Sequence, residues 1–206
     1  MKNRIPLLLL LALAACGGRR ETAPPVPAAT MPPILAGERV MIFPVQRGSV
    51  PSAAAAAHYS IDTGTLDTEL AYWLPQLAGN VRWIMPETIQ RAITRSPTLQ
   101  IEIENLEVGA FQRAEVKRIG DPLFGDLRKL AAVLDARVAV IPVAAEQVGA
   151  SRDSARVQVA TAVINALNGV VIWFGVIESE PDAEGEAAGV ASAAQKFARS
   201  FSGKKN

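Results

Sequence analysis

The feature that most constrains the fold is residues 157–177, a stretch of twenty-one mostly apolar residues. Its length is sufficient for a membrane-spanning helix. The stretch is rich in β-branched residues, however, and it contains the dipeptide Asn168-Gly169 near its middle. Asn-Gly between two apolar runs is typical of a β-hairpin, because both residues tolerate positive φ. Four polar residues also disfavour a lipid-embedded helix: Gln158, Thr161, Asn165 and Asn168. The sequence therefore predicts a hairpin.

Four other segments have strand-like patterns. Residues 39–45 (RVMIFPV) and 81–85 (VRWIM) are short apolar runs, each predicted to be a buried strand. Residues 137–142 (RVAVIP) follow a short turn, and their unbroken apolar character predicts a central strand buried on both faces. Residues 99–105 (LQIEIEN) alternate, which predicts either an edge strand or an extended linker.

The helices are predicted from apolar seams and start signals. Thr65 is a plausible N-cap, Pro86 suits a first helical position, and Asp121-Pro122 combines a cap with a proline start. The predicted seams are Leu66, Leu70, Trp73, Leu74 and Leu77; Ile89, Ala92 and Ile93; Leu123, Leu127, Leu130 and Leu134; and Val190, Ala194, Phe197 and Phe201.

These elements predict an α/β fold, close to the α+β class. We expect a mixed β-sheet of about five strands packed with helices, ending in a β-hairpin and a C-terminal helix. Residues 47–64 show no clear period and are predicted to be a loop, with a short helix over Ala53–Ala57 as the alternative.

The first sixteen residues resemble the signal of bacterial lipoproteins. Lys2 and Arg4 precede an apolar segment that is too short to cross a bilayer, and it ends in Leu13-Ala14-Ala15-Cys16, similar to a lipobox. The resemblance implies cleavage between Ala15 and Cys16, with diacylglyceryl and fatty acyl chains such as palmitate on Cys16. Gly17 stands where aspartate would signal inner-membrane retention, which implies the periplasmic face of the outer membrane. The alternative is an ordinary secretory signal.

Residues 16–35 are predicted to be the lipidated cysteine and a tether rich in proline and alanine. The nineteen residues after Cys16 would span about 25 Å as coil and up to about 60 Å as polyproline II. We expect residues 36–202 to form a single periplasmic domain, with residues 203–206 as a tail.

The charge balance bears on the class of partner. The chain of 206 residues carries a net charge of +1, and removal of residues 1–15 would take away Lys2 and Arg4 but no acid. A nearly neutral chain has no overall field to attract nucleic acid, so that class of partner is not expected. Because Cys16 is the only cysteine, disulfides and cysteine-based metal sites are excluded.

No catalytic, metal or cofactor site is predicted. His58 is the only histidine, and no G-x-S-x-G motif accompanies it, so we expect a solvated loop histidine. Phosphate-binding glycine loops are absent. The basic residues Arg113, Lys117 and Arg118 fit an ordinary charged surface. An acidic run lacks calcium-loop spacing; it comprises Glu178, Glu180, Asp182, Glu184 and Glu186.

The predicted domain resembles a group of envelope proteins. This group contains the N-terminal domain of the Tol-system translocation protein, the curli secretion-channel lipoprotein, and lipoprotein activators of penicillin-binding proteins. The resemblance rests on the segments RVMIFPV, LRKLAAVLDARVAVIP and VATAVINALNGVVIWFGVI. In those families the hairpin often has an aspartate, a short turn, a glycine and then a strand with a tryptophan, and this chain has Asn165, Gly169 and Trp173 in the comparable positions. It implies a scaffold for protein assembly and supplies no catalytic residues. The long alternating membrane hairpins of the curli channel are missing from residues 47–64 and 99–119.

Three functions follow as hypotheses. The first is a non-enzymatic, membrane-anchored binding or assembly factor that contacts another envelope protein. The second is an envelope hydrolase that uses His58. The third is a subunit of an oligomeric secretion assembly, and self-association is left open.

The anchor can be tested by replacing Cys16 with serine. We expect Cys16→Ser to move the protein from the membrane fraction to the soluble periplasmic fraction, because serine cannot take the thioether-linked lipid. Fractionation followed by immunoblotting measures this, and circular dichroism should show the same fold. Unchanged membrane attachment would contradict the lipoprotein prediction.

Overall fold

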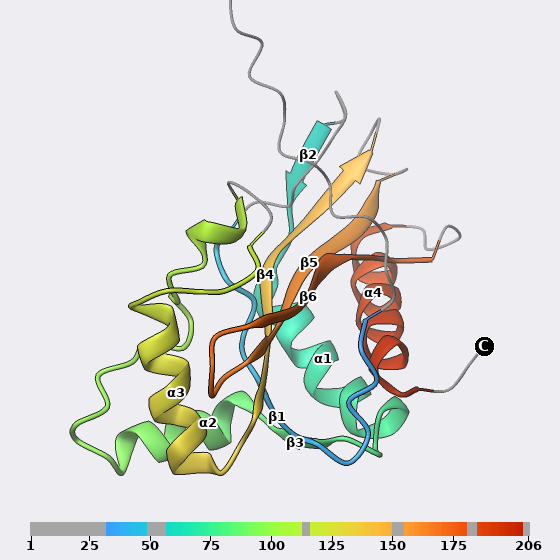
Figure 1. Cartoon of the computed structure of the whole chain (residues 1–206). Helices are drawn as coiled ribbons and strands as arrows, with labels where there is room; N and C mark the ends of the chain where they lie inside the picture. The colour runs from blue at the N-terminus through green and yellow to red at the C-terminus, as the bar shows by residue number, and fades with distance from the viewer. Residues whose placement is uncertain (1–31, 49–56, 113–115, 150–154, 181–184, 204–206) are drawn as a thin grey trace, which may run out of the picture.

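A computed structural model describes residues 32–48, 57–112, 116–149, 155–180 and 185–203 (Figure 1). The elements run in the order β1 (Arg39–Ile42), β2 (Ala57–Ser60), α1 (Thr63–Leu77), β3 (Arg82–Ile84), α2 (Pro86–Thr94), the 3-10 helix η1 (Gly109–Gln112), α3 (Leu123–Leu134), β4 (Val138–Gly149), β5 (Arg156–Asn165), β6 (Val171–Glu178) and α4 (Gly185–Phe201). None of the described helices is long and apolar enough to cross a membrane.

The strands form one mixed sheet, which confirms the predicted α/β class. The order is β3-β1-β4-β5-β6, and β2 pairs with β4 as a sixth strand. β3, β1 and β4 are parallel, whereas β4, β5 and β6 are antiparallel. β4 is central, as expected. Its first three residues pair with β1 and its last four residues pair with β2, while β5 lies along its other edge.

Helices cover both faces of the sheet (Figure 1). α1 and α4 pack together on one face, over Val40 and Ile42 of β1. α2 and α3 lie on the other face, over Met41 and Phe43. Alternate residues of a strand point to opposite faces, so burial on both sides explains why the residues of β1 after Arg39 are all apolar. The predicted seam of α4 is buried along its whole length.

The strand β2 was not predicted. It pairs with the overhanging end of β4 over Ala57–Gly149 to Ser60–Glu146. Its sequence AHYS has no apolar pattern that would predict a strand. The strand forms through its pairing with β4. The expectation of a loop or helix is therefore wrong for Ala57–Ser60, and the rest of the alanine run lies outside the described residues.

Residues 99–105 form no strand, so the extended linker is the correct alternative. Leu99, Ile101 and Ile103 are nevertheless buried, as the alternation indicates. The side chain of Gln46, 2% exposed, takes the place of a neighbouring strand. Its Nε2 donates to the carbonyl of Ile103 at 2.9 Å, and its Oε1 accepts from the N–H of Leu106 at 2.7 Å. A side chain therefore supplies the backbone bonds that a strand would have made.

Two helix starts differ from the prediction. Asp62, not Thr65, caps α1: its Oδ1 accepts from the N–H of Gly64 at 3.1 Å, and its Oδ2 accepts from the hydroxyl of Thr65 at 2.6 Å. Asp121 does accept from the N–H of Gly125 at 2.9 Å, but Pro122 lies at the cap position and α3 begins one residue later. Pro86 begins α2 as predicted.

The hairpin prediction is confirmed. β5 and β6 pair antiparallel, and Gly169 in the turn has φ +73°. The side chain of Asn165 accepts from the N–H of Leu167, and that of Asn168 accepts from the N–H of Val170, both at 3.0 Å. A Cβ at Gly169 would lie 3.0 Å from Cδ2 of Phe124. This turn therefore requires glycine for both conformation and space.

We expect Gly169→Ala to lower the free energy of unfolding by about 1 to 3 kcal/mol, because alanine disfavours positive φ and would contact Phe124. Urea denaturation measures the change. Gly120→Ala is the matched control, since Gly120 has no atom within 4 Å of its Cβ position and no positive φ. Equal effects of the two substitutions would contradict the analysis of the turn.

A second stability prediction concerns Asp67 on α1. Its Oδ1 accepts from the N–H of Val45 at 2.9 Å. The pKa of this carboxyl is raised from 3.8 to about 6, chiefly by burial and to a smaller extent by the charges of Glu104 and Asp62, although the hydrogen bond from Val45 lowers it. Because the folded state holds the proton more tightly, the stability should fall as the pH rises from 3.8 to about 6.

We expect Asp67→Asn to remove this pH dependence and to stabilise the protein at pH 7 by about 1 to 2 kcal/mol, a value reduced for the partial exposure of the carboxyl to water. Urea midpoints at pH 5 and pH 7 measure the change. Asp126→Asn on α3 serves as the control. A variant that is less stable than the wild type at pH 7 would show that the anionic hydrogen bond outweighs the cost of burial.

Candidate binding site

Three arginines lie in one row across the sheet. Arg39 begins β1 and is the register partner of Arg82, which begins β3. Arg137 directly precedes β4, and its N–H donates to the carbonyl of Arg39 at 3.3 Å. Parallel strands start at the same end of a sheet, so residues far apart in sequence come together here. Neighbouring strands are about 4.8 Å apart, which places these three backbones side by side.

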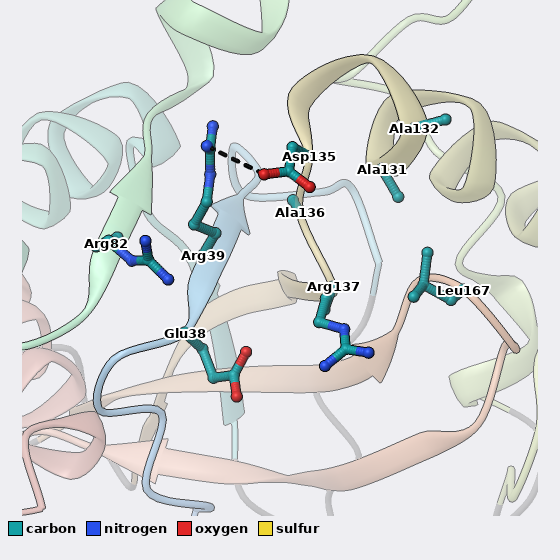
Figure 2. A pocket seen from close by; sticks show the side chains of 9 residues that line it. All are labelled: Glu38, Arg39, Arg82, Ala131, Ala132, Asp135, Ala136, Arg137 and Leu167. Atoms are coloured by element: carbon teal, nitrogen blue, oxygen red, sulfur yellow. Dashed lines mark hydrogen bonds and ion pairs between the residues drawn. The ribbon is translucent and has the colours of Figure 1, made fainter.

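The arginines line a cleft of about 330 Å³ at this end of the sheet (Figure 2). One wall is the C-terminal end of α3, and another is the turn between β5 and β6. The lining residues are Glu38, Arg39, Arg82, Ala131, Ala132, Asp135, Ala136, Arg137 and Leu167. The volume is within the range of sites that bind small ligands.

Two of the arginines are held by internal partners. Nη2 of Arg39 donates to the carbonyl of Leu134 at 2.8 Å, and its Nη1 lies 3.4 Å from Oδ2 of Asp135. Arg82 donates through Nε and Nη2 to the carbonyl of Gly37, at 3.1 and 2.7 Å. These bonds fix the two side chains and leave several of their N–H groups unused.

Arg39 also closes the end of α3. Asp135, with φ +50°, ends this helix in the left-handed conformation, and its N–H donates to the carbonyl of Ala131. The N–H of Ala136 donates to the same carbonyl at 3.0 Å. The negative end of the helix dipole is therefore partly neutralised before any ligand enters the cleft.

Glu38 and Arg137 differ from the other charged residues of the cleft. Within the described ranges, neither side chain has a hydrogen bond or an ion pair. Figure 2 shows both projecting on the same side of the cleft, whereas Arg39 turns toward Asp135. An unpaired carboxylate and an unpaired guanidinium therefore face one small volume.

A second candidate surface is the outer edge of β6. The sheet order places β6 at one end, with β5 as its strand neighbour. Among the described residues, the backbone hydrogen bond that reaches this edge is at the start of β6, where the N–H of Val171 donates to the carbonyl of Lys117 at 3.0 Å. Ile172 is 43% exposed, and Phe174 and Val176 are half-buried. A long apolar edge of this kind is a template for the addition of another strand.

His58 lies on β2 and not in a loop. Its Nδ1 is 2.5 Å from Oε2 of Glu146 on the neighbouring strand β4. A hydrolytic histidine needs a nucleophile within hydrogen-bond reach. In the described part of the chain, no serine, threonine or cysteine side chain forms a hydrogen bond with His58. The pair joins two strands, and the geometry gives no support to a serine–histidine site.

The remaining predicted residues are distributed as follows. Ala15, Cys16 and Arg113 lie outside the described residues, so the lipid attachment stays a prediction. In the acidic run, Glu178 accepts from Gln158 at 2.6 Å, and Glu180 lies 3.8 Å from Lys196. Asp182 and Glu184 are not described. Within the described ranges, no group of three or more histidine, cysteine, aspartate or glutamate side chains could hold a metal ion.

The arginine cleft was not predicted from the sequence. A signal was present, because Arg39, Arg82 and Arg137 each directly precede an apolar run that becomes a parallel strand. A basic residue at three equivalent strand starts becomes one site only if the strands are neighbours. That neighbourhood is a property of the sheet order.

No protein-family model and no curated protein matches the chain. Lipoprotein GNA1162 from Neisseria meningitidis is similar in structure, with 9% identity over 68% of this chain and 78% of that one, at a TM-score of 0.39. The C-terminal domain of LpoB from Escherichia coli is also similar, with 14% identity over 71% of this chain and 85% of that domain, at a TM-score of 0.41. A chain of the PelC dodecamer from Paraburkholderia phytofirmans has 15% identity over 85% of this chain and 95% of its own length, at a TM-score of 0.43.

Proposed function

We propose that this protein is a lipid-anchored, non-enzymatic binding factor of the bacterial envelope, which contacts another envelope protein through the outer edge of β6. The observation that carries the proposal is that edge. The anchor follows from Cys16, and Gly17 favours the outer membrane, with the domain in the periplasm.

The composition of β6 favours strand addition. Its sequence is VIWFGVIE, in which Glu178 is the only charged residue, and it contains no proline or lysine. Natural edge strands usually carry such residues to block association. Added strands gain affinity from main-chain hydrogen bonds and specificity from alternate side chains, here Ile172, Phe174 and Val176.

The opposite edge of the sheet contrasts with β6. β3 has only three residues, one of which is the charged Arg82. A short, charged strand offers few backbone groups to a partner. β6 is therefore the edge of this sheet that best fits an extended segment of another protein.

The predicted tether suits this role. Leu35, 4% exposed, packs against the α1–α4 side of the core, and the N–H of Gly37 donates to the carbonyl of Asn80 at 2.8 Å. The chain between Cys16 and Leu35 would span about 1.3 to 3 Å per residue, so the domain could reach a partner some tens of ångströms from the membrane.

We expect Ile172→Lys to weaken partner binding at least about tenfold, because a charged side chain on the edge opposes strand addition. Crosslinking in envelopes that carry the lipidated protein, followed by pull-down, measures the recovered partner. Val133→Lys is the matched control: Val133 is an equally apolar residue, 51% exposed, on α3.

Both variants should melt close to the wild-type temperature. Unchanged recovery with Ile172→Lys would contradict the proposed edge. Recovery of only the protein itself, with a concentration-dependent dimer that Ile172→Lys abolishes, would support the oligomeric assembly in place of a different partner.

A further inference from the structure

We propose that the arginine cleft is a second binding site, which takes a small zwitterion of the α-amino-acid class with an aliphatic side chain. The site is separate from the β6 edge and does not depend on the function proposed for it. Glu38 would hold the ammonium group of the ligand, and Arg137 would hold its carboxylate.

The unpaired charges carry this assignment. Glu38 and Arg137 line the same cleft and project on the same side, yet they do not form an ion pair with each other (Figure 2). A ligand that bears both charges can satisfy both groups at once. The guanidinium of Arg137 has five donors in a planar fork, which matches a carboxylate with two parallel hydrogen bonds.

A simple anion fits the cleft less well. Of the two carboxylates of the cleft, Asp135 is paired with Arg39, whereas Glu38 has no cationic partner. The three arginines give the lining a net charge of +1, which attracts an anion, but an anion bound beside Arg137 would leave Glu38 unpaired and close to a second negative charge. A cationic ligand would be repelled by the three arginines. The zwitterion avoids both costs.

The apolar part of the lining indicates the side chain. Leu167, in the turn between β5 and β6, is 47% exposed, and Ala131 and Ala132 lie across from it on α3. Contact with an aliphatic group would remove the exposed surface of Leu167 from water. The volume of about 330 Å³ accommodates one amino acid and not a folded partner.

The test uses three probes that share the leucine side chain and differ in their charged groups: L-leucine, its methyl ester, which lacks the carboxylate, and N-acetyl-L-leucine, which lacks the ammonium group. Calorimetry with the full-length lipidated protein in detergent measures their affinities. We expect leucine to bind at least about tenfold more tightly than either analogue, since each analogue lacks the group that would pair with one of the two unpaired charges, Glu38 or Arg137.

Variants assign the two charges. Arg137→Gln and Glu38→Gln should each weaken leucine binding about tenfold, whereas Arg128→Gln, on the exposed face of α3, should leave it unchanged. Glu38→Gln should also bind N-acetyl-L-leucine more tightly than the wild type does, because the repulsion is removed. A role of Glu38 in folding alone would not produce that gain.

Several results would overturn the proposal. They are the absence of leucine binding at millimolar concentration, equal affinity for all three probes, or an equal loss in Arg128→Gln. Tighter binding of inorganic phosphate than of leucine would also overturn it and would identify the cleft as an anion site.

Discussion

The burial of β4 on both faces is the constraint on which the rest of the fold depends. The first eight residues of this strand, Val138–Ala145, are all buried. Buried backbone groups must find hydrogen-bond partners, which β1 and β2 supply along one edge and β5 along the other. Its side chains require an apolar layer on each face, which α1 and α4 provide on one side and α2 and α3 on the other.

Both candidate surfaces are consequences of this arrangement. The parallel strands β3, β1 and β4 start at the same end of the sheet, which brings Arg82, Arg39 and Arg137 into one row. The antiparallel half ends at β6, whose outer edge has no neighbouring strand in the described part of the chain. The three arginines of the cleft and the β6 edge therefore come from different halves of one sheet.

Sequence patterns predicted the elements whose burial is regular. The first and central strands were found because their apolar runs are unbroken, the hairpin because Asn168-Gly169 separates two apolar runs, and the last helix because its apolar residues follow one period. The strand β2 was missed because it exists only through its pairing with β4, and residues 99–105 were left open because Gln46 replaces a neighbouring strand. Neither interaction has a local signal in the chain.

The sequence by itself determined the class of fold, the position of the hairpin at Asn168-Gly169 and the predicted lipid anchor at Cys16, because these depend on residues that are adjacent in the chain. Only the tertiary structure decided that Arg39, Arg82 and Arg137 share a cleft, that Glu38 and Arg137 remain unpaired within it, and that β6 is the open edge. Strand order and register set these relations, and they join residues more than forty positions apart.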